Sequence, residues 1–233
     1  MTRAFLRELL FPRNCAICGK ALFFGREAWY GLCGGCMKGL EPGGEERCVS
    51  CGKPLISEDS RCLPCREGEA GSLDRAYSIY PYSGPWRKLL AAYKFEKNRA
   101  LGNFLAEKLT EAAAQAGFTG KDGGLPWVPV PPRPHKIRRT GWDQVSYISL
   151  LLKKLGLPVY SCLKRLPSQS QKKLDRGGRM TNLKGRVICI KQPPAELILF
   201  DDVITTGATL NTCAAALKAE GTLRVLGLSL FYG

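Results

Sequence analysis

Residues 197–210 read Leu-Ile-Leu-Phe-Asp-Asp-Val-Ile-Thr-Thr-Gly-Ala-Thr-Leu, and this stretch decides the fold. It begins with four apolar residues that show no alternation, which is typical of a strand buried on both faces of a parallel sheet. Two carboxylates, Asp201 and Asp202, follow this run, and a short turn with hydroxyl groups leads into a helical pattern from Thr209. Because ligands of open parallel sheets bind beyond the carboxyl ends of the strands, we expect a binding site at this turn.

Each part of the turn suits a phosphorylated ribose. Backbone N–H groups at a helix N-terminus receive a phosphate, and Gly207 allows close approach of the backbone. Adjacent carboxylates accept hydrogen bonds from vicinal ribose hydroxyls, either directly or through Mg²⁺. The alternative is a capped turn whose two carboxylates are simply solvated.

The surrounding chain alternates apolar runs with helical patterns, which predicts an α/β domain. Strands are expected at residues 76–82, 127–130, 159–162, 187–190, 197–201 and 223–230. Helices are expected at residues 86–95, 101–116, 144–155 and 209–219. This alternation favours a doubly wound, mostly parallel sheet.

The first part of the chain is rich in cysteine, with eight of its eleven cysteines arranged as four Cys-x-x-Cys pairs. The pairs are Cys15 and Cys18, Cys33 and Cys36, Cys48 and Cys51, and Cys62 and Cys65. Two pairs complete one tetrahedral thiolate site, so the count suits two structural zinc ions. Disulfides could also use eight cysteines, but thiols stay reduced in the cytosol that we expect for this chain. A redox role is disfavoured because the motif occurs four times outside any βαβ unit.

The pairing of the knuckles stays open at this stage. Sequential pairing closes the shorter loops, whereas a cross-braced arrangement or a single occupied site would fit the same spacing. One to two zinc ions are therefore expected. The polar run at residues 67–72 indicates a linker, so we predict a double zinc-binding module with a short N-terminal helix at residues 1–71 and the α/β domain at residues 72–233.

Charge is concentrated in the second part of the chain. The net charge is +15, and residues 133–186 alone carry 14 basic and two acidic residues. Such a stretch favours phosphate or nucleic acid as a partner, although a solubilising surface is the alternative. No apolar run approaches the ~20 residues of a membrane-spanning helix, so we expect a cytoplasmic protein with no membrane span.

The motifs carry a resemblance to known families. Residues 197–210 look like the phosphoribosyl pyrophosphate signature of type I phosphoribosyltransferases. Residues 93–95 (Tyr-Lys-Phe), 128–131 (Val-Pro-Val-Pro), 138–144 (Arg-Arg-Thr-Gly-Trp-Asp-Gln) and 171–185, together with the cysteine-rich start, resemble the ComF competence family. The resemblance covers nearly the whole chain.

This resemblance implies a type I phosphoribosyltransferase fold and a set of binding residues. Asp201 and Asp202 would hold the ribose hydroxyls, with Mg²⁺ accompanying phosphoribosyl pyrophosphate. The 5′-phosphate would contact Thr205, Thr206, Gly207, Ala208 and Thr209. The pyrophosphate would lie in the loop at residues 128–139, against Val130, Lys136, Arg138 and Arg139.

Two positions in this loop region need separate comment. Asp143 stands where the ComF family usually has asparagine, and a carboxylate beside a pyrophosphate weakens anion binding. His135, the only histidine, could be a general acid, but a surface donor is the more common role of a histidine in a basic loop.

Two functions from different classes remain open. One is an enzyme that transfers phosphoribosyl to an unidentified nucleophile, with catalysis by electrostatic stabilisation of the departing pyrophosphate. The other, implied by the ComF resemblance, is a non-catalytic module of the DNA-uptake machinery that binds a nucleotide or single-stranded DNA, with a competence helicase as a further partner. The sequence has no motif that identifies the acceptor.

Overall fold

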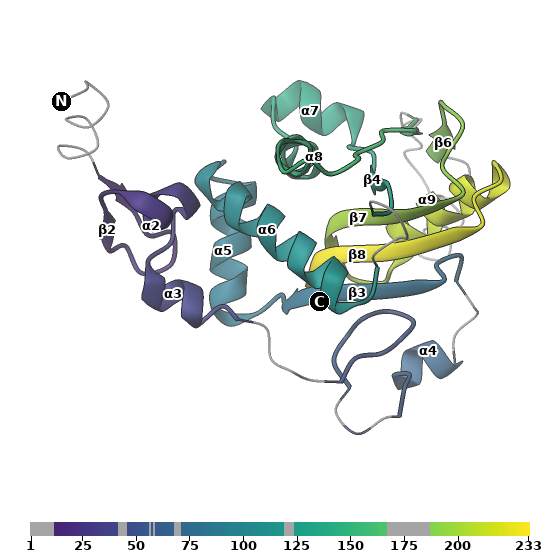
Figure 1. Cartoon of the computed structure of the whole chain (residues 1–233), viewed down its shortest axis with the longest axis horizontal. Helices are drawn as coiled ribbons and strands as arrows, with labels where there is room; N and C mark the ends of the chain where they lie inside the picture. The colour runs from purple at the N-terminus through teal and green to yellow at the C-terminus, as the bar shows by residue number, and fades with distance from the viewer. Residues whose placement is uncertain are drawn as a thin grey trace, which may run out of the picture.

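A four-stranded parallel sheet forms the centre of the computed structural model, which describes residues 12–41, 46–55, 57, 59–67, 71–118, 124–166 and 187–233 (Figure 1). The strand order is β3-β8-β7-β4, and every neighbouring pair is parallel. The strands are β3 (Arg75–Pro81), β4 (Trp127–Pro129), β7 (Glu196–Ile204) and β8 (Arg224–Tyr232).

Helices cover both faces of this sheet. They are α5 (Gly84–Lys94), α6 (Ala100–Gln115), α7 (Pro134–Thr140), α8 (Gln144–Lys154) and α9 (Ala208–Ala219). Ile198 and Phe200 of β7 pack in one hydrophobic cluster with α6 and α8, whereas Leu197 and Leu199 pack in a second cluster with α9. Because successive side chains of a strand point to opposite faces, the unbroken apolar run of β7 is what a two-sided burial requires. The predicted doubly wound α/β fold is confirmed.

The sheet has a switch point between β4 and β7. From β4 the chain crosses outward to Val159, which forms a single parallel bridge with Trp127 at the sheet edge. From β7 it crosses in the other direction, to β8. The connections therefore diverge on either side of the β4–β7 pair, and a crevice opens at the carboxyl ends of these two strands.

The cysteine module packs against the α/β domain in two separate places. Its first half contains β1 (Arg13–Asn14), β2 (Ala21–Leu22), α2 (Gly25–Tyr30) and α3 (Gly34–Lys38), and it lies beside α6 (Figure 1). Leu22, Tyr30 and Leu32 are buried in the same cluster as Leu101 and Phe104 of α6, so the two parts share one core. The second half contains α4 (Leu63–Glu67) and lies against β3.

Gly52 and Arg47 hold the second half on β3. A Cβ atom on Gly52 would lie 2.4 Å from the Tyr77 Cα, so the knuckle contacts the strand backbone directly. Arg47 donates hydrogen bonds to the carbonyls of Ser78 and Ile79, and its guanidinium lies 4.8 Å from the centre of the Tyr77 ring. This docking site on β3 could not be read from the cysteine spacing.

Two predicted strands of the sheet are wrong. Residues 159–162 contribute only the bridge at Val159, because two backbone hydrogen bonds on either side of Trp127 are all that hold this edge before the chain leaves the sheet. The strand predicted at residues 187–190 is β6 (Val187–Cys189), which pairs antiparallel with β5 (Leu163–Arg165) in a separate two-stranded sheet.

The remaining helix and strand predictions differ from the structure by a few residues at their ends, and α7 was not predicted. The segment predicted as a short helix at the N-terminus, and residues 171–185 of the family resemblance, lie largely or wholly outside the described residues. None of the described helices has the length and apolar content that a bilayer crossing requires.

Candidate functional site

A cavity of about 440 Å³ lies at the carboxyl ends of β4 and β7. Its walls come from the end of β4, the β7–α9 turn, the start of α8, the end of α5 and β5. Among its lining residues are the predicted Asp201, Asp202, Thr205, Thr209 and Val130, together with Arg133, Asp143, Gln144, Lys94 and Arg165. The sequence motif and the switch point of the sheet therefore coincide in one site.

Asp202 is almost completely engaged by the protein. Its Oδ2 accepts hydrogen bonds from Lys94 Nζ at 2.9 Å and from Gln144 Nε2 at 2.6 Å, while its Oδ1 accepts one from the Val203 backbone N–H at 3.0 Å. Burial alone would raise the pKa of this carboxyl, but the Lys94 ammonium and the hydrogen bonds outweigh burial and lower the pKa. Asp202 is thus an ionised anchor between α5, α8 and β7.

Asp201 has a different environment on the opposite face of the strand. Its Oδ1 accepts a hydrogen bond from the Asp202 backbone N–H at 2.8 Å. Burial, and then the charge of Asp202, raise the pKa of Asp201 well above its usual value. A carboxyl group that burial makes costly to ionise gains most from a ligand that donates hydrogen bonds to it.

The β7–α9 turn presents the other half of the site. Gly207, the residue that precedes α9, has φ 73° and ψ −3°, a left-handed conformation that strongly favours glycine. Thr205 and Thr209 line the cavity, whereas Thr206, Gly207 and Ala208 form the turn between them. The first turn of α9 carries no acidic residue, so its N-terminal N–H groups offer a positive potential at this end of the cavity.

Asp143 does not act as a free anion beside the cavity. It precedes α8, and its Oδ1 accepts a hydrogen bond from the Ser146 backbone N–H at 2.8 Å. This helix cap explains why a carboxylate is tolerated where the family usually has asparagine. Tyr93, which donates a hydrogen bond of 2.6 Å to the Gln144 carbonyl, fixes the start of the same helix from α5.

Three cavity residues were not singled out as ligands from the sequence. Lys94 belongs to the Tyr-Lys-Phe match, which was the only signal for it, and Gln144 ends the match at residues 138–144. Arg165 carried no signal beyond its place in the basic stretch. Its Nε is buried and has no hydrogen-bond partner among the residues that the structure describes.

The predicted basic loop is a helix in the structure. Arg138 and Arg139 lie exposed in the last turn of α7 and are not among the cavity-lining residues. The side chains of His135 and Lys136 lie outside the described part of the protein. The predicted roles of these four residues stay predictions.

The eight cysteines form two clusters of four, which settles their pairing as sequential. One cluster is Cys15, Cys18, Cys33 and Cys36; the other is Cys48, Cys51, Cys62 and Cys65. Within each cluster all four sulfurs lie within 4.8 Å of one another.

Sulfur separations show which chemistry the clusters suit. Cys18 and Cys33 have their sulfurs 3.6 Å apart, and Cys51 and Cys62 have theirs 3.7 Å apart. A disulfide requires about 2.05 Å, whereas Zn–S bonds of about 2.3 Å in a tetrahedron place sulfurs about 3.8 Å apart. The clusters are two zinc-binding sites.

Backbone groups prepare these sites for a cation. Burial alone would raise the thiol pKa of Cys15 and Cys48, but backbone N–H groups of the knuckles outweigh it and lower both pKa values to about 6. Each cluster therefore contains a thiol that becomes a thiolate readily, which is the form that binds zinc.

Comparisons with known proteins agree with these observations. The double zinc ribbon domain family matches residues 6–66. The solved structures with similar folds include hypoxanthine phosphoribosyltransferase from Trypanosoma cruzi, at a TM-score of 0.36 and 14% identity over 59% of this chain and 65% of that one. Orotate phosphoribosyltransferase from Aeropyrum pernix matches at a TM-score of 0.32 and 16% identity over 62% of each chain. Likeness of this degree assigns no activity.

Curated relatives are closer to the chain and cover most of it. Competence protein ComFC of Streptococcus pneumoniae is 28% identical over 85% of this chain and 86% of its own length. Competence protein F of Haemophilus influenzae is 30% identical over 85% of this chain and 90% of its own length. With this identity along nearly the full length of both proteins, and with its double zinc ribbon preceding a parallel α/β domain, the chain belongs to the ComF family of competence proteins.

Proposed function

We propose that the cavity between β4 and β7 binds phosphoribosyl pyrophosphate or a related ribose 5-phosphate. The observation that carries this proposal is the β7–α9 turn, which places a carboxyl pair and a helix N-terminus in one cavity at the switch point of the sheet. The carboxyl pair suits ribose hydroxyls, and the helix N-terminus suits a phosphate.

In this proposal the 5′-phosphate lies at the start of α9. The backbone N–H groups of the turn and the hydroxyls of Thr205 and Thr209 donate to its oxygens, and the left-handed Gly207 keeps the backbone close to the anion. Twelve residues of α9 align their peptide dipoles behind this position.

The two carboxyls have unequal roles in the proposal. Asp201 is the ribose acceptor, because its carboxyl has one hydrogen bond from the backbone and lines the cavity. Asp202 holds the site together through Lys94 and Gln144. This division refines the sequence-based expectation that both carboxylates hold the ribose equally.

The pyrophosphate lies toward the end of β4. Arg133 and Arg165 line this part of the cavity, and neither has an ion pair with a carboxylate among the described residues. Mg²⁺ would accompany the ligand and neutralise charge on the pyrophosphate, with Asp201 as the available carboxylate, since Asp202 is occupied by Lys94.

Turnover follows the same arrangement if an acceptor binds. The protein's contribution is electrostatic, because cations and N–H donors around a departing pyrophosphate stabilise the charge that develops on it. We propose phosphoribosyl transfer in the context of competence and DNA uptake, which the names of the curated relatives support.

Calorimetric titration with phosphoribosyl pyrophosphate and Mg²⁺ tests the binding proposal. Replacing both carboxyls (Asp201→Asn with Asp202→Asn) should weaken binding at least about tenfold, since charge-assisted hydrogen bonds are lost. If the site recognised phosphate alone, removing negative charge would leave binding unchanged or tighten it. Circular dichroism checks that wild type and variant fold alike, and release of pyrophosphate in the presence of a cell extract tests turnover.

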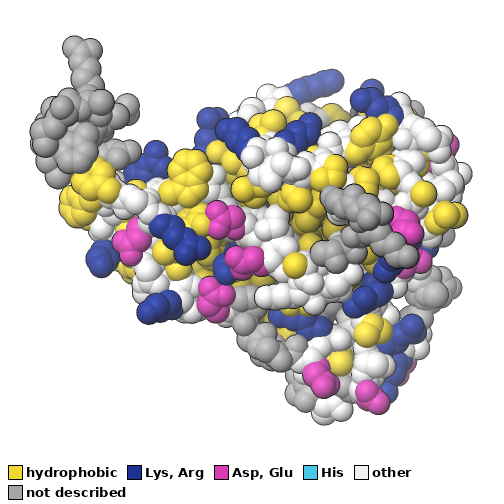
Figure 2. Space-filling view, in the orientation of Figure 1, with side chains coloured by type: hydrophobic (Ala, Val, Ile, Leu, Met, Phe, Trp, Pro, Cys, Tyr) yellow, Lys and Arg dark blue, Asp and Glu magenta, His cyan; other side chains and the backbone are white. Residues whose placement is uncertain are grey.

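A second candidate function is single-stranded DNA binding on the outer surface. The observation that favours it is α7, whose exposed Ile137, Arg138 and Arg139 extend the basic surface beside the cavity. Figure 2 shows Lys and Arg side chains along the upper edge of the molecule, where Figure 1 places α7 and α8.

Salt dependence tests this second function. Oligothymidylate binding should weaken steeply with salt because phosphate contacts release counterions. Arg138→Gln with Arg139→Gln should flatten the slope by about two counterions. An unchanged slope would place any bound strand elsewhere.

A further inference from the structure

A second cleft, of about 510 Å³, lies where the first zinc cluster meets the α/β domain. It is bounded by β1, β2 and α2 on one side and by α6 and α8 on the other. The cleft shares no lining residue with the cavity at the carboxyl ends of the strands. Nothing in the proposed ribose phosphate site makes use of it.

Close contacts on one side of α6 leave this space open on the other. Gly31 meets Ala100 so closely that an added Cβ would lie 3.1 Å from the Ala100 Cβ. Asn103 donates a hydrogen bond of 3.0 Å to the Trp29 carbonyl, which fixes α2 against α6. Small residues along these helices then keep the cleft wide; they are Gly25, Ala28, Ala100 and Ala106.

The floor and walls of the cleft are apolar and partly open to solvent. Trp29 is 60% exposed, Leu155 is 51% exposed and Phe23 is 45% exposed, and all three line the cleft with the buried Leu151. Clustered exposure of large apolar side chains is unusual for a surface without a partner. The mixture of tryptophan, tyrosine, leucine and arginine is typical of the centre of a protein interface.

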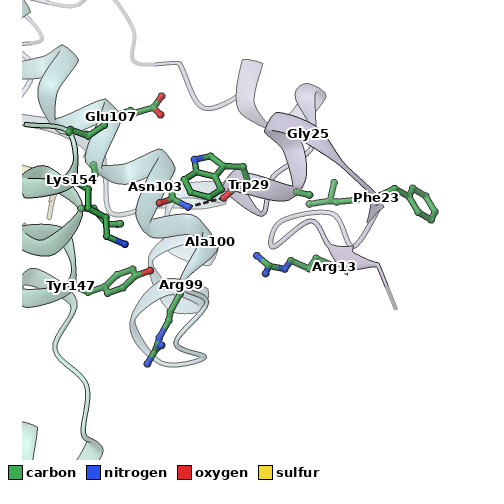
Figure 3. Close-up of a pocket in the computed structure, with 15 residues that line it drawn as sticks. Arg13, Phe23, Gly25, Trp29, Arg99, Ala100, Asn103, Glu107, Tyr147 and Lys154 are labelled. Carbon is green, nitrogen blue, oxygen red and sulfur yellow. Dashed lines mark hydrogen bonds between the residues drawn. The ribbon is translucent and has the colours of Figure 1, made fainter. Parts of the chain in front are cut away.

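The rim of the cleft is positively charged. Figure 3 shows Arg13 on one wall and Lys154 with Tyr147 on the other, with Trp29 between them. Arg99 adds a third cation at the rim. The single acidic lining residue, Glu107, accepts a hydrogen bond from the Tyr30 hydroxyl and is therefore already engaged.

A nucleobase suits this cleft less well than an apolar side chain. Tyr147 packs against Trp142 at 5.1 Å between ring centres and against the Arg99 guanidinium at 5.9 Å, so its ring is already in contact with neighbours. This leaves Trp29 as the open aromatic surface, above a floor of leucine and alanine. Aliphatic floors bind leucine or phenylalanine side chains through burial of apolar area.

We propose that this cleft is a docking site for an acidic segment of a partner protein that inserts a leucine or phenylalanine anchor beside Trp29. The anchor fills the apolar floor, and carboxylates that flank it lie against Arg13, Arg99 and Lys154. The positive rim excludes a second copy of this chain as the favoured occupant, since the chain carries a net charge of +15.

The test uses short synthetic peptides and the full chain with zinc bound. The probe peptide has a Leu-Phe pair between runs of glutamate and aspartate. Two matched peptides replace the pair by Ala-Ala or the acidic runs by lysine. The indole N–H signal of Trp29, assigned by nuclear magnetic resonance with Trp29→Phe, reports occupation of the cleft, and calorimetry gives the affinity.

Charge reversal locates the binding site. Arg13→Glu with Lys154→Glu should weaken binding of the acidic Leu-Phe peptide about tenfold or more. The matched control is Lys20→Glu with Lys153→Glu, which makes the same change of charge at exposed residues of the same two regions outside the cleft lining. The control should keep its affinity within about twofold at the same salt. Zinc content and circular dichroism verify that both double variants are folded.

The proposal is overturned by any of four outcomes. The first is that the Ala-Ala peptide binds as well as the Leu-Phe peptide, and the second is that both charge-reversed proteins lose affinity equally. The third is that oligothymidylate moves the Trp29 signal at lower concentrations than the peptide, which would make the cleft a nucleic-acid site. The fourth is a self-association, seen by sedimentation, that Trp29→Ala abolishes.

Discussion

Lys94 Nζ lies 2.9 Å from Asp202 Oδ2, and this ion pair joins the last turn of α5 to the strand that carries the candidate ligand site. The Asp202 side chain is 10% exposed and that of Lys94 is 26% exposed, so water screens the pair only in part. Removing one partner leaves the other partly buried and uncompensated.

Lys94→Met should therefore lower the free energy of unfolding at pH 7 by about 1.5–3 kcal/mol. Because the folded-state pKa of Asp202 is lowered, the stabilisation is fully present above the unfolded carboxyl pKa of about 4 and is lost as pH falls through the folded value. Urea unfolding at several pH values checks this, with the exposed Lys88→Met on the same helix as control. A difference between Lys94→Met and wild type that does not shrink in acid would contradict the assignment.

The two neighbouring carboxyls should respond differently to single substitutions. Asp202→Asn should reduce stability, since it removes the partner of Lys94. Asp201→Asn should keep or increase stability at pH 7, because burial raises the pKa of Asp201 and makes its charged form costly in the folded protein. It should nevertheless weaken phosphoribosyl pyrophosphate binding about tenfold. Equal stability losses in the two variants would show that Asp201 is also a structural anchor.

Arg165 should contribute to ligand binding with little effect on folding. Its buried Nε has no partner among the described residues, and its side chain lines the cavity. Arg165→Gln should weaken binding of phosphoribosyl pyrophosphate by about 1.5–3 kcal/mol, whereas Lys164→Gln, an exposed neighbour on the same strand, should leave it unchanged. The same loss in both variants would indicate a general charge effect.

Two knuckle glycines provide a matched pair for the docking of the second zinc cluster. Gly19 and Gly52 have φ values of 77° and 73°, so alanine costs about 1–2 kcal/mol of backbone strain at either site. A Cβ at Gly19 meets nothing within 4 Å, whereas at Gly52 it meets the β3 backbone. Gly52→Ala should thus lower the melting temperature clearly more than Gly19→Ala. Equal shifts would mean that the knuckle does not rest on β3.

Zinc content should be two ions per chain by elemental analysis of protein purified without chelator. Cys48→Ser should remove about one ion and leave the cluster of Cys15 intact, because sequential pairing makes the sites separate. Loss of both ions from this variant would indicate that the two sites depend on each other.

Local patterns were sufficient for the main features of this protein. The unbroken apolar run at residues 197–200 predicted a strand buried on both faces, and the adjoining Asp201 and Asp202 predicted the ligand site. The Cys-x-x-Cys spacing predicted two four-thiolate clusters. These features lie in short segments whose own residues carry the chemistry, so they can be predicted from the sequence.

Contacts between distant segments were decided only by the tertiary structure. Lys94 and Asp202 are 108 positions apart, and their pairing depends on how α5 packs against the sheet. The same holds for Gly52 on β3, for Arg165 in the cavity, and for the edge at Val159, where competition between the sheet and the β5–β6 hairpin decides the pairing. Hydrophobic periodicity shows which face of an element is buried, but apolar burial is non-directional, so the partner of each face is fixed only when the whole core packs.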